Sequence, residues 1–320
     1  MADDERKEEQ EVPAPWDRGF RRVVPSPQSA AAPHGGDRER PFRKERPRGG
    51  VPTIRRDRNE RPADRGEVRP WIRRIALLKT DKGREKEARF LLEGARCVEE
   101  VLKSSPGIVV KVILSPDFRN PELSKLLAKA EIEPETVPAH EFDYLASTVS
   151  TQGIVAVCNQ SALKPHWESA HLVTLVDSVQ DPGNLGAIFR TSLAFGMDAV
   201  VCGRGTVDPF NPKVVRGSSG TFLRVPFETG CDLAERIRFL RQNGFTIVAT
   251  SPHARKSLDE IKMRKRVAFL VGNEGNGADQ RLIDAADETV RIPMNSALES
   301  LNVAVAHGIV ASLLWNSRKA

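Results

Sequence analysis

Cysteine is scarce in this sequence, and its placement argues against two common kinds of site. The chain of 320 residues holds four cysteines, none in a C-x-x-C pair and none at a metal-ligand spacing from a histidine. We therefore expect neither a metal site nor a disulfide framework, and this usage is typical of a reducing compartment. The four cysteines are Cys97, Cys158, Cys202 and Cys231.

Long apolar runs are also missing. No segment reaches the roughly 20 apolar residues that span a bilayer, and the N-terminus lacks the apolar core of a signal peptide. We therefore expect a cytoplasmic protein with no membrane partner.

Aliphatic side chains are rare in residues 1–70, which hold ten of the 22 prolines. Residues 1–74 carry 19 basic and 14 acidic side chains, a net charge of +5, whereas the remaining 30 basic and 29 acidic residues give +1. Such a segment cannot bury enough apolar surface to offset the entropy lost on folding, so we predict a disordered tail. It is either an arm that binds RNA phosphates through arginine or a segment that only solubilises the protein.

A small α/β/α domain is predicted over residues 72–160. It pairs no nucleophile with a base, so the pattern indicates a binding or structural role rather than catalysis. A linker over 161–171 follows it. Apolar side chains at helical spacing predict a helix over 84–104. The other predicted elements are short helices over 121–130 and 141–147 and strands over 108–114, 136–138 and 153–157.

Strands and helices alternate again over residues 170–318. The strands are apolar without alternation, which is typical of a parallel sheet buried on both faces. Ligands bind such sheets at the carboxyl ends of the strands, so the loops there hold the candidate site. We predict strands over 172–176, 199–202, 223–227, 245–249, 267–271 and 289–292, and helices over 184–195, 211–219, 233–243, 279–286 and 301–315.

Polar residues crowd the loop before the last predicted helix. Glu299, Ser300 and Asn302 stand where that helix begins, and a helix N-terminus presents backbone N–H groups that lack intrahelical partners. One interpretation is a capped helix and nothing more, because serine is a good N-cap residue. The other interpretation is a ligand-binding loop.

Two further loops follow predicted strands. In the first, an Asp-Pro-Gly turn precedes Asn184, and Arg190 stands nearly two helical turns later. An ordinary turn with Asn184 as a cap is the alternative. The second loop, 272–277, is glycine-rich, but its order matches neither G-x-G-x-x-G nor the Walker sequence. Its Glu274 would repel a phosphate, so a nucleoside or a positively charged ligand fits it better.

Four ordered segments closely resemble the SpoU/TrmH family. They are Asp-Pro-Gly-Asn-Leu-Gly-x-Ile-x-Arg-Thr (181–191), Asn-Pro-Lys-Val-Val-Arg-x-Ser (211–218), Phe-Leu-Val-Gly-Asn-Glu-Gly-x-Gly (269–277) and Ile-Pro-Met…Glu-Ser-Leu-Asn-Val-x-Val-Ala (292–306). The resemblance implies an S-adenosylmethionine-dependent RNA 2′-O-ribose methyltransferase of the SPOUT class. Its fold would be α/β, with a parallel sheet in a trefoil knot. Segments 90–96 and 152–156 make the first domain similar to an L30e-like RNA substrate-binding domain.

The resemblance also assigns roles to individual residues. Ser296 departs from the family, which usually has glycine there, and Thr151 stands where relatives often carry histidine. No metal is implied. Catalysis is assigned to Asn184, Arg190, Glu274, Ser300 and Asn302. Cofactor contacts, largely through backbone groups, are assigned around Thr250, Gly272, Ile292, Met294 and Leu301. Expected substrate contacts are Arg190, Arg216 and Ser218.

The expected partners are RNA and a second copy of the chain. Ribosomal RNA is the first candidate substrate and transfer RNA the second, because the L30e-like appendage is familiar from ribosomal RNA enzymes. A homodimer through the catalytic domain is implied by the family and by a last helix that is apolar on more than one face. A non-catalytic RNA-binding protein would be favoured if Asn184, Arg190 or Asn302 were replaced, and a Rossmann enzyme would need the missing G-x-G-x-x-G.

Overall fold

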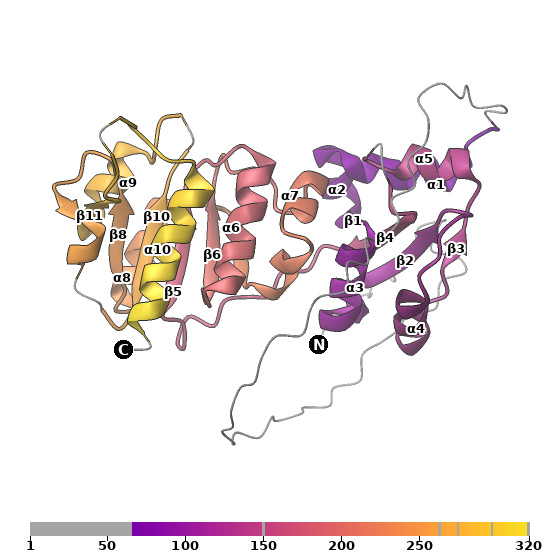
Figure 1. The fold of residues 1–320 in the computed structure, drawn as a ribbon, viewed down its shortest axis with the longest axis horizontal. Coiled ribbons are helices and arrows are strands. Elements are labelled where there is room, and N and C mark those ends of the chain that lie inside the picture. The colour runs from indigo at the N-terminus through magenta and orange to yellow at the C-terminus, as the bar shows by residue number, and fades with distance from the viewer. Residues whose placement is uncertain (1–65, 149–150, 262–263, 274, 296, 319–320) are drawn as a thin grey trace, which may run out of the picture. The chain divides into compact units, whose positions relative to one another are not determined.

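The computed structural model describes residues 66–148, 151–261, 264–273, 275–295 and 297–318. The predicted tail lies outside the described residues up to residue 65, as does the catalytic candidate Glu274. Figure 1 shows two sheets along the described chain, each with its own helices. Within the described residues, no helix combines the length and apolar character needed to cross a bilayer.

The first sheet has four strands in the order β1-β4-β2-β3. Strand β4 runs antiparallel to both β1 and β2, and β3 is parallel to β2, so the sheet is mixed. The strands are β1 (Arg89–Glu93), β2 (Val109–Leu114), β3 (Glu135–Thr136) and β4 (Ile154–Asn159), and the α-helices are α1 (Pro70–Ala76), α2 (Asp81–Glu87), α3 (Ala95–Ser104), α4 (Pro121–Lys129) and α5 (Ala139–Leu145).

The predicted helix over 84–104 is wrong. Ala88 adopts a φ of 48° and Gly94 a φ of 102°, and these left-handed residues interrupt the helix on both sides of β1. Along β1, Phe90 and Leu92 pack into one apolar cluster and Leu91 into another. A strand that is buried on both faces and followed directly by an amphipathic helix therefore has the same pattern of apolar residues as one long helix.

The second sheet has seven parallel strands in the order β7-β6-β5-β10-β8-β11-β9. The predicted parallel sheet is confirmed, but the strand predicted over 223–227 is wrong. The chain forms a 3-10 helix at Thr221–Arg224 and enters β7 only at Phe227. The strands are β5 (Leu172–Val176), β6 (Ala199–Gly203), β7 (Phe227–Cys231), β8 (Thr246–Thr250), β9 (Lys256–Ser257), β10 (Val267–Val271) and β11 (Glu288–Arg291).

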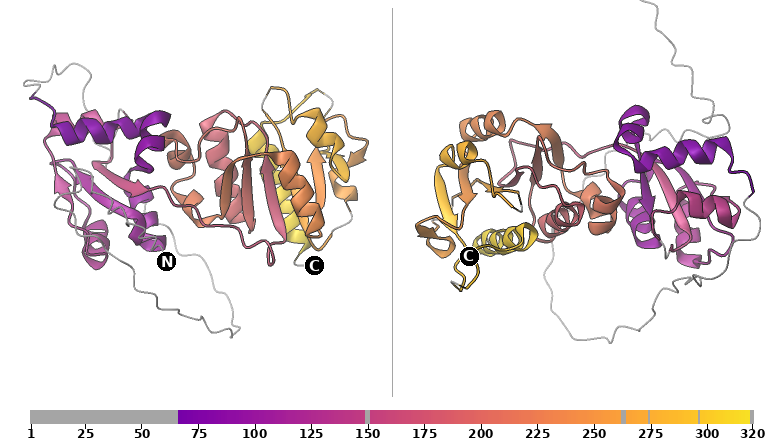
Figure 2. Two further views of the ribbon diagram at one scale, coloured as in Figure 1. Left: turned by 180° about the vertical axis from the view of Figure 1, so that it is seen from behind. Right: turned by 90° about the horizontal axis from the view of Figure 1, so that it is seen from above.

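Helices cover both faces of this sheet. Helices α6 and α10 lie on one face and α8 and α9 on the other, as the right-hand view of Figure 2 shows. Their apolar side chains accordingly belong to two separate core clusters. The helices are α6 (Pro182–Ala194), α7 (Pro212–Gly217), α8 (Leu233–Gln242), α9 (Gln280–Asp284) and α10 (Val303–Ser317).

The chain returns twice to the middle of the sheet. Strand β10 comes after β6, β7 and β8 in the sequence, yet it lies between β5 and β8 in the sheet. After β11, near the sheet edge, α10 runs back to pack against α6 (Figure 1). These two returns bring the start of α10 beside the start of α6.

Candidate active site

The start of α6 is fixed by the residues that lead into it. The carboxylate of Asp181 accepts a hydrogen bond from the backbone N–H of Asn184 at 2.9 Å, and Pro182 occupies the first helical position. Both features favour a helix start, because proline has no N–H to lose and aspartate satisfies one unpaired donor. The side chain of Asn184 is therefore carried on a well-defined first turn.

The start of α10 is fixed by Asn302. Its Oδ1 accepts hydrogen bonds from the backbone N–H groups of Ala304 at 2.9 Å and Val305 at 3.3 Å. The capping interpretation is thus correct for Asn302 rather than for a serine. The cap uses only the oxygen of the side-chain amide, so the nitrogen is left for another partner.

That partner is Asn184. Nδ2 of Asn302 donates to Oδ1 of Asn184 at 2.9 Å, across 118 positions of sequence. This hydrogen bond joins the first turns of α6 and α10 in a partly solvent-accessible position. It holds two amide side chains in a defined orientation at the carboxyl end of the sheet, where ligands of such folds bind.

Two other predicted catalytic residues are exposed and available. Arg190 on α6 makes no hydrogen bond or ion pair with any described residue, and Ser300, just before α10, makes none either. A guanidinium remains protonated in proteins, so Arg190 offers a fixed positive charge with five donors. Among the described residues, no carboxylate pairs with this charge, so its position suits the binding of an external anion.

The predicted cofactor residues follow β8, β10 and β11. The hydroxyl of Thr250, at the end of β8, donates to the Leu270 carbonyl at 2.9 Å and so ties β8 to β10. Ile292, Met294 and Leu301 lie half-buried in the segment between β11 and α10. Within the part of the chain that the structure describes, the backbone N–H groups of Met294 and Leu301 have no acceptor. Such a segment fits a ligand bound through backbone groups.

Gly272 is required by the loop itself. A Cβ added at Gly272 would lie 1.9 Å from the backbone nitrogen of Ala278, so no side chain fits there. The close approach is between two backbone segments of the loop after β10. Intolerance of a side chain at this position would therefore not, on its own, indicate a cofactor contact.

Two polar residues that the sequence analysis did not single out hold the loops together. Asn273 donates through Nδ2 to the Ser178 carbonyl at 2.8 Å, and Asp177 accepts from the backbone N–H of Asp279 at 2.7 Å. Both bonds join the loop after β5 to the loop after β10. Their sequence signal was a polar residue one or two positions after a buried strand, where parallel sheets often carry ligand or loop contacts.

The predicted substrate residues on and beside α7 occupy different surroundings. Nη1 of Arg216 lies 3.5 Å from a carboxylate oxygen of Glu93, so the arginine is ion-paired. Ser218 is fully buried, and its hydroxyl donates to the Val215 carbonyl at 2.9 Å. These positions do not favour a direct RNA contact by either side chain. Arg190 is the one of the three substrate candidates that is exposed.

Comparisons with known proteins agree with this geometry. Residues 171–312 match the model of the SpoU rRNA Methylase family, and residues 91–163 match that of RNA 2′-O ribose methyltransferase substrate binding. The chain is 37% identical over 244 residues to the 23S rRNA (guanosine(2553)-2′-O)-methyltransferase RlmP of Bacillus subtilis (strain 168), covering 76% of this chain and 94% of that protein.

Two further relatives extend the similarity. The 23S rRNA (guanosine-2′-O-)-methyltransferase RlmB of Bordetella pertussis is 31% identical over 231 residues, which cover 68% of this chain and 94% of that protein. The crystal structure of an AdoMet-bound rRNA methyltransferase from Sinorhizobium meliloti superposes with a TM-score of 0.69 at 25% identity, covering 80% of this chain and 97% of that one. Each of these relatives therefore matches both domains of the present chain.

Proposed function

We propose that this chain, which belongs to the SpoU rRNA methylase family of S-adenosylmethionine-dependent RNA 2′-O-ribose methyltransferases, methylates a guanosine of ribosomal RNA. The observation that carries the site assignment is the hydrogen bond between Asn184 and Asn302, which joins two of the four family segments. Guanosine of 23S ribosomal RNA is the substrate named for the relatives at 37% and 31% identity.

The cofactor site of this proposal is formed by the loops after β8, β10 and β11. Free backbone donors at Met294 and Leu301 fit the polar edges of an adenosine or of the methionine part. Gly272 keeps the loop after β10 compact beside them. When bound, S-adenosylmethionine supplies the methyl group as a sulfonium. The protein's part is to hold the ribose hydroxyl in line with that group.

Arg190 is the residue proposed to bind the RNA next to the reacting ribose. Its guanidinium binds an adjacent phosphate and stabilises the negative charge that develops on the 2′-oxygen as the proton leaves. Asn184, Asn302 and Ser300 orient the hydroxyl through hydrogen bonds. Glu274, outside the described residues, either orients Arg190 or accepts the proton.

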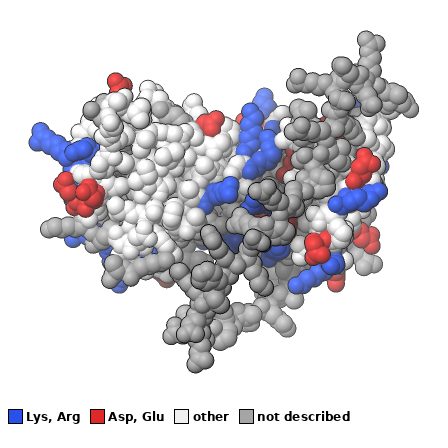
Figure 3. Space-filling model, viewed as in Figure 1, with Lys and Arg blue, Asp and Glu red and all other residues white. Residues whose placement is uncertain are grey.

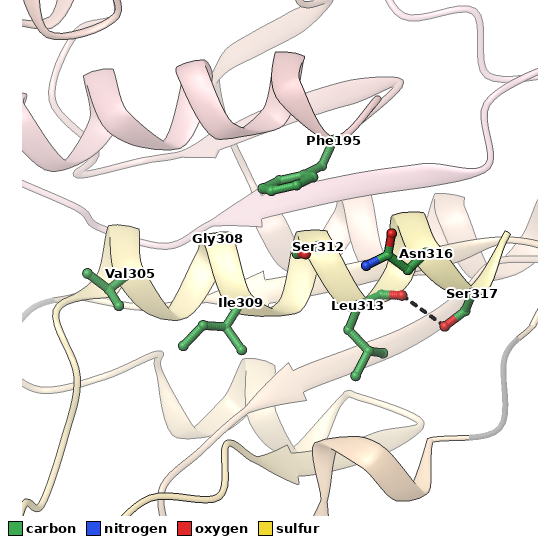
Figure 4. A pocket seen from close by; sticks show the side chains of 8 residues that line it. All are labelled: Phe195, Val305, Gly308, Ile309, Ser312, Leu313, Asn316 and Ser317. Atoms are coloured by element: carbon green, nitrogen blue, oxygen red, sulfur yellow. Dashed lines mark hydrogen bonds between the residues drawn. The ribbon is translucent and has the colours of Figure 1, made fainter. Parts of the chain in front are cut away.

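A homodimer through α10 is the second part of the proposal. Val305 is 51% exposed and Ile309 39% exposed on this helix, and both line a shallow groove with Phe195 and Leu313 (Figure 4). The surface over α10 also carries few charged side chains in the view of Figure 3. An uncharged apolar stripe on a helix suits the same stripe of a second copy related by a two-fold axis.

Substrate choice is tested with unmodified RNA. The purified protein is incubated with labelled S-adenosylmethionine and with ribosomal RNA or transfer RNA that lack modifications. The proposal predicts label in ribosomal RNA and an alkali-resistant bond after one guanosine. Label confined to transfer RNA, or placed on a base, would overturn it.

A further inference from the structure

A buried histidine links the helices of the site. His307 lies on α10, five residues after Asn302, and its side chain is fully buried. Its Nδ1 lies 2.7 Å from the hydroxyl of Thr191 on α6. Its Nε2 lies 3.1 Å from the hydroxyl of Thr174 on β5 and 3.3 Å from that of Ser192 on α6. Both ring nitrogens are therefore used inside the protein.

The neighbours of Thr191 indicate which nitrogen carries the proton. The Thr191 oxygen lies 3.0 Å and 3.1 Å from the carbonyl oxygens of Ala187 and Ile188, one turn earlier in α6. A hydroxyl has one hydrogen, so when Thr191 donates it to these carbonyls it must accept from Nδ1–H of His307. Nε2 is then the acceptor for the hydroxyls of Thr174 and Ser192.

The ring remains neutral in these surroundings. Its polar neighbours are three hydroxyl groups, and burial lowers the pKa of His307 to about 3. One face of the imidazole stacks on Phe269 of β10, with ring centroids 5.2 Å apart. A neutral imidazole with directed hydrogen bonds fixes geometry without placing a charge in the core.

These contacts join α10 to three other elements that lead into or carry the described site, namely β5, α6 and β10. Strand β5 leads into the loop before α6, and β10 leads into the loop of Gly272. Helix α6 carries Asn184 and Arg190, and α10 begins at Asn302. An ordinary core residue at position 307 would be apolar, because every buried polar group must find partners to avoid a desolvation penalty. The polar cluster instead specifies one register of α10 on α6.

We propose that His307 is a positioning residue for methyl transfer, which fixes α10 on α6 so that the Asn184–Asn302 pair and Arg190 keep their relative places. The hydrogen bond of Asn302 holds the two helices at their first turns, and His307 holds them five residues further along α10. Two separated contacts prevent both sliding and rotation, whereas one contact would allow α10 to rotate about it. This proposal rests on the proposed function in one respect, because the effect of His307 on activity is assayed as methyl transfer.

The test compares polar and isosteric variants of this cluster. Thr191→Val removes the hydroxyl that faces Nδ1, and Thr191→Ser retains it; His307→Ala and His307→Gln form a second pair. Val310→Ala, a fully buried position on the same helix with no polar partner, controls for a general loss of stability. We expect Thr191→Val and His307→Ala to lower kcat about tenfold to a hundredfold with little change in KM for RNA, because small misplacements of reacting groups have effects of this size.

The remaining variants decide the result. Thr191→Ser and His307→Gln should have a kcat close to that of the wild type. Val310→Ala should also have the wild-type kcat at temperatures where the protein is folded. Equal kcat for Thr191→Val and Thr191→Ser would overturn the proposal, and this pair decides even if the His307 variants do not fold.

A structural readout separates this proposal from the proposed function. Amide hydrogen exchange at Ala304 and Val305, the donors capped by Asn302, should speed up in Thr191→Val but not in Val310→Ala. Unchanged protection in Thr191→Val would contradict the positioning role. If the wild-type chain methylates no ribosomal RNA, the proposed function fails, and hydrogen exchange still decides the role of His307.

Discussion

Asn302 contributes to helix stability and to the proposed site through different atoms of one amide. Its oxygen caps α10 and its nitrogen binds Asn184. Aspartate is as good an N-cap as asparagine but has no donor, so one substitution separates the two roles.

We predict that Asn302→Asp keeps the stability of the protein and loses methyl transfer. Asn302→Ala should lose transfer too, and in addition about 1 kcal/mol of unfolding free energy through the missing cap. Urea denaturation and methyl incorporation into ribosomal RNA measure the two effects. Near-normal turnover of Asn302→Asp would show that the bond to Asn184 is dispensable.

His307 also predicts a specific acid sensitivity. Its folded pKa, about 3, lies below its ordinary value of 6.5, so the unfolded chain binds a proton that the folded chain does not. Stability should therefore fall as the pH drops from 6.5 towards 3, by up to about 1.4 kcal/mol for each pH unit, and this dependence should fade as the pH rises above 6.5. Between pH 6.5 and 5, the wild type should lose roughly 2 kcal/mol more than His307→Gln. Equal losses would mean that His307 is not buried as a neutral ring.

At the scale of the element, the loop after β10 is held by its own backbone. A Cβ at Gly272 would meet the Ala278 nitrogen at 1.9 Å, whereas one at Gly275 would come no closer than 3.5 Å to Asn273. We predict that Gly272→Ala lowers the unfolding free energy by about 1 to 3 kcal/mol and weakens S-adenosylmethionine binding. Gly275→Ala should change stability by much less. Thermal unfolding and calorimetry measure both, and similar behaviour of the two variants would be evidence against this loop geometry.

Helices and strands could be predicted where the pattern of apolar residues in the sequence matches the burial of those residues in the fold. Parallel strands such as β5 and β10 were recognisable from short apolar runs between polar loops. The segment 84–104 was not, because β1 is buried on both faces and its Leu91 and Leu92 stand at helical spacing from Ala95 of α3. The left-handed φ of Ala88, which separates α2 from β1, has no signal in the residue itself.

The site could be predicted where its residues lie in contiguous motifs. Asn184, Arg190 and Asn302 were predicted in this way, and the structure brings Asn184 and Asn302 into contact. The bonds of Asp177 and Asn273 join loops that are about 100 residues apart, and the partners of His307 come from β5, α6 and β10. No local pattern encodes such pairs, since they depend on the position of β10 between β5 and β8.

At the scale of the whole molecule, α10 connects the site to the proposed dimer. Buried residues of this helix, including His307 and Val310, face the sheet and α6, while Val305 and Ile309 face outward. Pairing of two α10 helices would cover these outward residues.

We predict a dimer at micromolar concentration and a monomer after Ile309→Asp, because a buried unpaired carboxylate is costly. Leu163→Asp, which changes an apolar side chain 49% exposed outside the groove, is the matched control and should remain dimeric. Sedimentation velocity distinguishes the states. A monomeric wild type, or a dimeric Ile309→Asp, would exclude this interface.

The central claim, that methyl transfer takes place where α6 meets α10, is tested most directly with two exposed arginines. Arg190 on α6 and Arg238 on α8 both lack ion pairs among the described residues, but α8 packs on the opposite face of the sheet. Single-turnover methyl transfer to ribosomal RNA is measured for Arg190→Ala and Arg238→Ala. We predict that Arg190→Ala slows transfer about a hundredfold or more, as expected for the loss of a charged transition-state contact, while Arg238→Ala stays near the wild-type rate. Near-normal transfer by folded Arg190→Ala would contradict the account.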